Sequence, residues 1–363
     1  MKKAQCATCG LVQSVDVPAQ DELALLYREG YDIYNNRPAS EQFVTGRYTA
    51  LAQAITSSVA PFRPHQVLEV GCGNGSALEA IQAVWDTADC RGLEPTVSAV
   101  NVAAARGLKV FQGMIGSVLP DEIAGRKYDV VYSIHVIEHT ENPIDYLGDL
   151  KGMLAPGGQL IITCPNARTP NLEIMRTDHH YSMVPYHLNV LARKAGLLPI
   201  KSTLCPGGDE GLDDEHNQLL VCCLPGSQSV GETVSLPDYL SAAGRMHLFE
   251  ARSKYFHAFD TLDDRLQPRL EGLDNLYCFG TGGWACMLVG YAPRTWSQVK
   301  ACVIDGGADV TFCGKAILPY SALANIKADG ILVGVNPASQ PQIADRLDAD
   351  GWNSIRWDDI IEM

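Results

Sequence analysis

A short apolar run that ends in three alternating glycines limits most strongly what this chain can fold into. Residues 67–70 (Val-Leu-Glu-Val) predict a buried strand, and an Ala/Leu-rich helical pattern over 76–84 follows the glycines. Gly71 and Gly73 tolerate positive φ and carry no Cβ, so a ligand can approach the backbone beside a helix N-terminus. The G-x-G-x-G spacing differs from dinucleotide and phosphate loops, and no lysine follows. The loop therefore favours a less anionic nucleoside ligand.

The letters around this loop, VLEVGCGNG, resemble the first motif of class I S-adenosylmethionine (SAM)-dependent methyltransferases. The resemblance implies that the loop binds SAM. It assigns the cofactor contacts of the loop to Glu69, Gly71, Cys72, Gly73 and Gly75. The alternative is a strand–loop–helix turn that binds no ligand.

A carboxylate stands at the end of the next strand. The strand over 90–94 ends at Pro95, and its last residue is Glu94. An acid about 20 residues beyond the glycine loop, at the carboxyl end of a strand, can accept both hydroxyls of a ribose. We therefore predict that Glu94 binds the ribose of SAM; an exposed loop glutamate is the alternative.

Three further strands are predicted over 109–112, 128–134 and 159–166. After the first, Met114 and Ile115 stand where the family has its adenine contacts, and they would form apolar walls for the ring. His135 follows the second and is expected to face the methionine part of SAM. HVIEHTENP and the L-x-P-G-G-x-L-I-I-T-x-P-N pattern also resemble the family. The alternation of strands and helices predicts an α/β fold: a doubly wound, Rossmann-like SAM-binding domain with its ligand at the carboxyl ends of parallel strands.

HVIEH also matches the H-x-x-E-H zinc signature. That interpretation needs both histidines on one helix face, whereas here the first directly follows a buried strand. We therefore predict no metal, and expect Glu138 and His139 to orient the next helix or to line the acceptor cleft.

The segment Asp178-His179-His180-Tyr181-Ser182-Met183 supplies the candidate catalytic groups. Methyl transfer from a sulfonium needs alignment and removal of a proton from the acceptor, and a neutral histidine suits that role. In the nucleotide-sugar C-methyltransferases that the chain resembles, a loop of the type EHxxYFS carries such groups, although this loop is shorter. We predict His180 and Tyr181 as catalytic, with His179 next; a loop held by His–Asp hydrogen bonds is the alternative.

The N-terminal segment carries a C-x-x-C knuckle at Cys6 and Cys9. CxxCGLVQ and the tyrosines that follow resemble the end of a zinc-ribbon head in the same subfamily, but two of the four cysteines are missing, so zinc is not expected. Tyr27, Tyr31 and Tyr34 could cover the SAM pocket or pack at the surface.

The C-terminal part begins a second strand–loop–helix unit. Gly280, Gly282 and Ala285 satisfy G-x-G-x-x-A, and Asp305 ends the next strand. The resemblance implies a smaller Rossmann-like domain that helps hold the acceptor without using NAD; a working dinucleotide site is the rival. The predicted division is a head over 1–45, a SAM domain over 46–225, a linker and one long bridging helix (237–270) within 226–270, and a C-terminal domain over 271–363.

The composition of the chain limits the classes of partner that it is expected to bind. The net charge of −14 disfavours nucleic acid or an anionic membrane, and no apolar run is long enough for a membrane span. The 12 cysteines are scattered and partly inside apolar runs, as in a cytoplasmic protein with reduced thiols. We predict a SAM-dependent methyltransferase of a small molecule, most simply a nucleotide-linked sugar, that could form a homo-oligomer. The alternatives are an NAD-dependent or bifunctional enzyme and a non-catalytic SAM-binding protein.

Overall fold

The computed structural model describes residues 3–29, 41–59, 61–176, 178–206, 217–226, 242–306 and 311–361. Contacts divide the chain into two units, 1–246 and 247–363, and each is described by itself. The predicted boundaries at 45, 225 and 270 divide the chain more finely and remain predictions. No helix in the described ranges combines the length and hydrophobicity that a bilayer crossing requires.

The first unit is built on a seven-stranded sheet in the order β5-β4-β3-β6-β7-β10-β9. Its strands are β3 (Gln66–Val70), β4 (Asp89–Glu94), β5 (Val110–Gln112), β6 (Tyr128–Ile134), β7 (Leu154–Pro165), β9 (Leu198–Cys205) and β10 (Asn217–Cys223). The first five are parallel, whereas β10 runs antiparallel to β7 and to β9. The predicted parallel sheet is therefore completed by one reversed strand.

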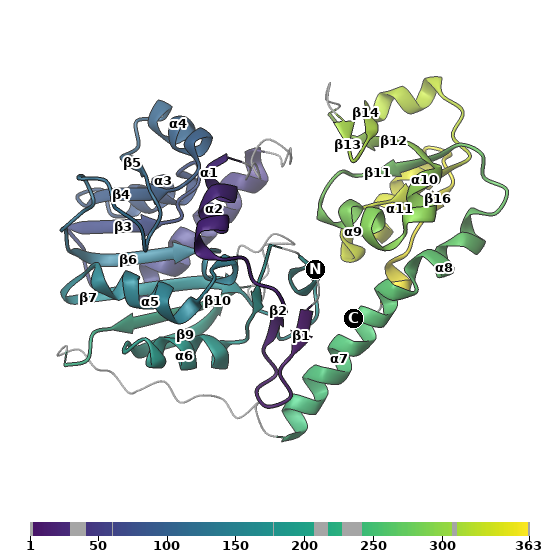
Figure 1. Ribbon diagram of the computed structural model, residues 1–363. Coiled ribbons are helices and arrows are strands. Elements are labelled where there is room, and N and C mark those ends of the chain that lie inside the picture. The colour runs from purple at the N-terminus through teal and green to yellow at the C-terminus, as the bar shows by residue number, and fades with distance from the viewer. Residues whose placement is uncertain are drawn as a thin grey trace. The chain divides into compact units, whose positions relative to one another are not determined.

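Helices cover both faces of this sheet, because neighbouring strand residues point to opposite sides. On one face Leu68, Val131 and Ile162 pack with α5 (Pro143–Gly152) and α6 (Pro185–Lys194). On the other face Val67 and Val130 join a core with α2 (Glu41–Ser58), α3 (Ser76–Val84) and α4 (Val97–Ala105). Figure 1 shows these helices on either side of the strands. The predicted doubly wound α/β fold is confirmed.

A small N-terminal sheet is attached to this unit. Strands β1 (Lys3–Gln5) and β2 (Val12–Ser14) form a hairpin, and β2 also pairs with β8 (Tyr181–Ser182). Helix α1 (Gln20–Glu29) follows the hairpin. The head segment is thus joined by backbone hydrogen bonds to the loop that carries the candidate catalytic residues.

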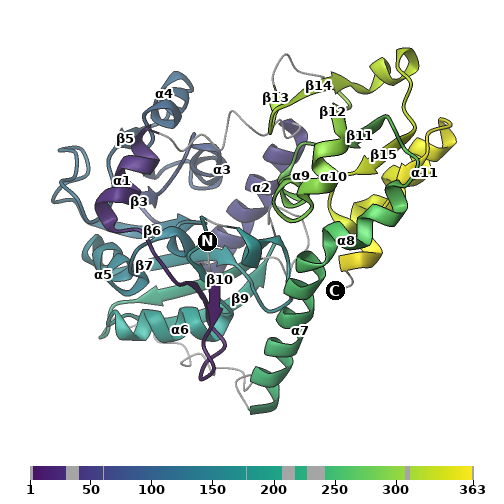
Figure 2. The same cartoon turned by 45° about the vertical axis from the view of Figure 1, so that its right-hand side comes forward.

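The second unit has a six-stranded sheet in the order β13-β14-β12-β11-β15-β16. Its strands are β11 (Leu276–Phe279), β12 (Val299–Ile304), β13 (Thr311–Phe312), β14 (Lys315–Pro319), β15 (Gly330–Val333) and β16 (Ser354–Ile355), and only β13 pairs antiparallel among the described residues. Helices α9 (Gly283–Tyr291), α10 (Pro293–Gln298) and α11 (Gln340–Ala349) accompany it (Figure 2). The predicted smaller Rossmann-like domain is present.

The long helix predicted over 237–270 is interrupted. The structure has α7 (Ala242–Asp260), α8 (Leu262–Leu266) and a 3-10 turn over Gln267–Leu270, while residues 237–241 lie outside the described residues. The break falls at Thr261, whose Oγ1 donates to the His257 carbonyl at 2.9 Å. The prediction of one continuous helix was therefore wrong. The Thr261 hydroxyl and the Thr261 N–H share the His257 carbonyl, and such back-bonding by threonine often bends a helix.

Candidate active site

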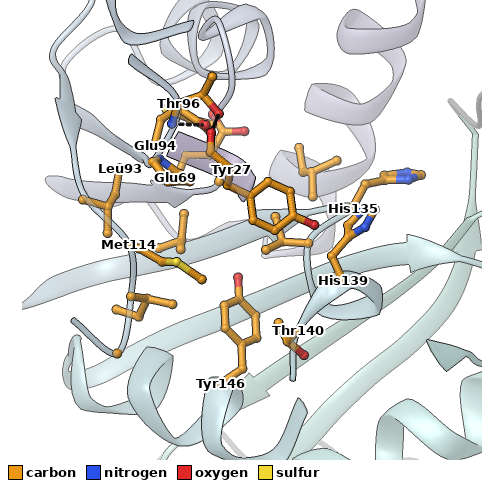
Figure 3. Close-up of a pocket in the computed structure, with 18 of the residues that line it drawn as sticks. Tyr27, Glu69, Leu93, Glu94, Thr96, Met114, His135, His139, Thr140 and Tyr146 are labelled. Carbon is orange, nitrogen blue, oxygen red and sulfur yellow. Dashed lines mark hydrogen bonds between the residues drawn. The ribbon is translucent and has the colours of Figure 1, made fainter. Parts of the chain in front are cut away.

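A cavity of about 660 Å³ opens at the carboxyl ends of β3, β4 and β6 in the first unit. Its volume lies within the range that small-molecule sites span. The position is the one at which doubly wound sheets bind ligands. Figure 3 shows Glu94, Thr96 and Met114 on one side of the cavity and His135 and His139 on the other.

The glycine loop forms the floor beside β3. Gly71, Gly73 and Gly75 all have positive φ, at 75°, 54° and 79°. A Cβ at Gly71 would overlap the side chain of Val136, and one at Gly75 would lie 2.5 Å from Leu108 Cδ1. Gly71 and Cys72 line the cavity, whereas the predicted contact residues Gly73 and Gly75 are not part of its lining.

Glu94 joins the end of β4 to the glycine loop. Its Oε2 accepts a hydrogen bond from the Gly73 N–H at 2.8 Å, and its Oε1 accepts one from the Thr96 N–H at 2.9 Å. The side chain is buried and lines the cavity. Each carboxylate oxygen can accept a further hydrogen bond, so both remain able to receive ribose hydroxyls.

Glu69 is a second buried acid in the lining. The hydroxyl of Tyr132 donates to its Oε2 at 2.9 Å. Burial, opposed by the Tyr132 hydrogen bond and assisted by the charge of Glu94, raises the pKa of the Glu69 carboxyl to about 8. A cationic ligand beside Glu69 would restore its charge.

Apolar groups close another side. Met114 and Ile115 line the cavity next to Leu93, as the adenine prediction requires. Helix α1 adds Tyr27, whose carbonyl accepts a hydrogen bond from Thr96 Oγ1 at 3.0 Å. Tyr31 and Tyr34 lie outside the described residues.

His135 lines the cavity with an unusual backbone. Its φ of 54° is in the left-handed region, which costs free energy for residues other than glycine and is often found at functional sites. Its Nδ1 lies 3.5 Å from Glu138 Oε1.

Two histidine rings meet at one wall of the cavity. His139 and His179 both line it, and their ring centroids are 4.6 Å apart in an edge-to-face arrangement. Nδ1 of His139 donates to the Asp178 carbonyl at 2.7 Å, and Nδ1 of His179 forms a hydrogen bond with Glu173 Oε2. Burial, and then the neighbouring His179, lower the pKa of His139 to about 3, so its ring is neutral.

Glu138 lies beside these rings and is completely buried. Burial, and then the charge of Glu173, raise the pKa of its carboxyl well above the usual range. Sequence reasoning did not identify Glu173 as a site residue. The only signal was an acid in the turn Leu172–Met175, capped by Asn171 and six residues before His179.

The other two predicted catalytic residues do not line the cavity. His180 is buried, and its backbone N–H donates to the Glu138 carbonyl at 2.7 Å while its carbonyl accepts from the Ser14 N–H at 2.8 Å. The Tyr181 hydroxyl donates to the Glu141 carbonyl at 2.7 Å. His180 and Tyr181 therefore connect the N-terminal hairpin to the loop after β6. Of the three predicted catalytic residues, only His179 lines the cavity.

Two further candidate sites also have a place in the structure. Cys6 and Cys9 are free thiols in the turn of the β1–β2 hairpin, and no group of three potential metal ligands in the described residues includes them. In the second unit Gly280 has a φ of 110°, while the Asp305 carboxylate is paired with Arg346 at 2.6 Å. The proposed ribose acid of a dinucleotide site is therefore engaged by a guanidinium.

Comparisons with known proteins agree with this architecture. A family described as "Methyltransferase domain" matches residues 43–197. A ubiquinone biosynthesis O-methyltransferase of Roseobacter denitrificans is 26% identical over 181 residues, which cover 45% of this chain and 72% of that protein. A tRNA U34 carboxymethyltransferase of Methylococcus capsulatus is 34% identical over 115 residues, or 30% of this chain and 34% of that protein.

Among solved structures, a plantazolicin methyltransferase in complex with SAH is 17% identical, with a TM-score of 0.42 over 56% of this chain and 94% of that chain. The family match lies within the unit that contains the cavity. Residues 43–197 form a class I SAM-dependent methyltransferase domain, and the protein is a methyltransferase that uses SAM.

Proposed function

We propose that SAM binds in the cavity with its ribose on Glu94 and its adenine against Met114 and Ile115. The observation that carries this proposal is the double role of Glu94, which holds the Gly73 and Thr96 amides and still lines the cavity. The methionine part would then extend toward Glu69, Cys72 and His135. Its ammonium group is the cation that suits the buried Glu69 carboxyl.

The acceptor is proposed to be a small polyhydroxylated molecule, and a sugar is the leading candidate. Glu141, Asp145 and Asp149 line the cavity and can accept hydrogen bonds from hydroxyl groups. Arg47 and Arg176 are also part of the lining, and a phosphate of a nucleotide-linked sugar would be bound by these cations. The O-methyltransferase relative favours oxygen as the methylated atom.

His179 is proposed as the residue that acts on the acceptor. Because Nδ1 is held by Glu173, the lone pair of the ring is at Nε2, where it can take the proton that the acceptor loses. The acceptor atom attacks the methyl carbon, the carbon–sulfur bond breaks, and S-adenosylhomocysteine (SAH) leaves with the electron pair on sulfur. His180 and Tyr181 would support the loop rather than touch the acceptor.

Calorimetry with SAH and mass spectrometry with candidate acceptors test this proposal. We expect one SAH site per chain and a product heavier by one methylene group. His179→Ala should lower kcat at least tenfold without changing SAH affinity, because proton removal contributes about 10²–10⁴-fold. His65→Ala, an exposed histidine outside the cavity, is the matched control. A His179→Ala enzyme at full rate would place the base elsewhere, and a protein without SAH affinity would overturn the cofactor site.

A further inference from the structure

Three potential metal ligands converge at the histidine wall of the cavity. Within the described residues, Glu138, His139 and His179 form the one group whose ligand atoms all lie within 4.8 Å of one another. All three side chains are buried, with exposed fractions of 0%, 9% and 4%. Two imidazoles and one carboxylate are a common protein set for a divalent transition metal.

Glu138 gives a second, independent indication of a ligand. Neither of its carboxylate oxygens has a hydrogen-bond partner among the described residues, although His135 Nδ1 lies 3.5 Å from Oε1. A buried polar group without a hydrogen bond is costly, so native proteins almost always satisfy it with protein, water or an ion. A cation bound between Glu138 and the two rings would satisfy this carboxylate.

Both histidines are also held as metal ligands usually are. A histidine ligand commonly donates its second ring nitrogen to a carbonyl or a carboxylate, which fixes the ring orientation. Here Nδ1 of His139 bonds to the Asp178 carbonyl and Nδ1 of His179 bonds to Glu173. Nε2 is therefore the nitrogen that each ring would present to a cation.

We propose that Glu138, His139 and His179 bind a divalent cation of the Zn²⁺, Mn²⁺, Co²⁺ or Fe²⁺ class. Imidazole ligands favour these metals over Mg²⁺ and Ca²⁺, which prefer oxygen. Three protein ligands leave coordination positions open, as in catalytic rather than structural sites. Because His139 and His179 line the cavity, the open positions are accessible to the acceptor.

The bound cation would take over the activation of the acceptor, and this part of the inference rests on the proposed function. An acceptor hydroxyl coordinated to the cation loses its proton to solvent at a lower pH than a free hydroxyl. The resulting oxygen attacks the methyl carbon of SAM, the carbon–sulfur bond breaks, and neutral SAH leaves. In this state His179 is a ligand and not the base. Open positions on one cation select an acceptor with two adjacent oxygens, such as a vicinal diol.

Metal titration tests the site without any assay of turnover. Chelator-treated protein would be titrated with ZnCl₂ and MnCl₂ by calorimetry and with CoCl₂ by visible absorption. Every titration would use a Cys6→Ser, Cys9→Ser background, because these two thiols could bind Zn²⁺ by themselves. We expect one site per chain and absorption bands typical of nitrogen and oxygen ligands.

Variants then assign that site. Glu138→Gln keeps the shape of the side chain and should weaken binding at least tenfold, and His179→Ala should do the same. Glu173→Gln, which replaces the charged partner of His179 with a neutral amide, should weaken metal binding about 10–100-fold. Glu141→Gln, a carboxylate of the same cavity outside the group, is the control and should leave metal affinity unchanged.

Absence of a stoichiometric site, or equal affinity in Glu138→Gln and the unaltered background, would overturn the inference. If metal-free enzyme in excess chelator binds SAH and methylates the acceptor at full rate, the proposed catalytic role of the cation is refuted while the proposed function stands. Metal binding at these residues in a protein without SAH affinity would instead retain the site and refute the proposed function.

Discussion

Replacing Gly71 by alanine tests whether packing against Val136 requires a glycine at the first position of the loop. A residue other than glycine at φ 75° lowers the unfolding free energy by about 1–2 kcal/mol. Alanine recovers about 0.4–1 kcal/mol of this, because it reduces the conformational entropy of the unfolded chain. The new Cβ would also overlap Val136, and such overpacking typically costs about 1–3 kcal/mol. We expect Gly71→Ala to lose about 1–4 kcal/mol of unfolding free energy.

The chain contains a matched control. Gly107 has a φ of 79°, but a Cβ there would meet no atom within 4 Å. Gly107→Ala should therefore show the backbone cost alone, about 1 kcal/mol or less. For a unit of this size the expected decrease in Tm is about 2–4 °C per kcal/mol. Thermal unfolding and urea unfolding measure both variants.

SAH calorimetry completes the comparison. Gly71→Ala should weaken SAH binding, because the methyl group lies in the wall of the cavity, while Gly107→Ala should not. A double variant with Val136→Ala should lose less than the sum of the two single losses, since the overlap is gone. Equal losses for Gly71→Ala and Gly107→Ala would refute the packing argument.

Three further predictions concern the cofactor. Glu94→Gln keeps one acceptor but turns an NH₂ group toward one of the two amide N–H donors, so SAH affinity should fall at least tenfold by calorimetry, and unchanged affinity would remove Glu94 from the site. Gly73→Asp places a carboxylate beside Glu94 and should abolish SAH binding; retained affinity would contradict the proposed position. Glu69, with its pKa near 8, is mostly protonated at pH 7 and should release its proton when the SAM ammonium binds. Affinity should then rise from pH 6 to 8, with binding heats at pH 7 that differ between phosphate and Tris, and buffer-independent heats would count against it.

The geometry of the proposed cofactor site could be predicted because its signals are local. The apolar run before Gly71 forms a buried strand that ends at the glycine loop, and the next strand ends at Glu94, directly before Pro95. In a parallel sheet those two ends must lie side by side. The geometry of the pair therefore follows from two short segments and one rule of topology.

The acceptor half could not be predicted in the same way. Which of His179 and His180 faces the cavity depends on the pairing of β8 with β2 and on the His180 N–H bond to Glu138, both of which join residues far apart in sequence. Glu173 was missed although it lies only six residues before His179, because no motif in that segment shows that the two side chains meet. The reversed direction of β10 is likewise set by its partners in the sheet.

The attachment of the N-terminal hairpin and α1 affects how this enzyme should be trimmed. The family match begins at residue 43, yet Tyr27 lies against the ring of His139 with 6.3 Å between centroids, and β2 supplies the edge that β8 pairs with. A fragment that begins at residue 43 would keep the glycine loop and Glu94 but would lose Tyr27, which lines the same cavity. It would also stop at residue 197 and so omit both β10 and β9, the last two strands of the sheet. Inactivity of such a fragment would reflect its missing walls, not the chemistry of the enzyme.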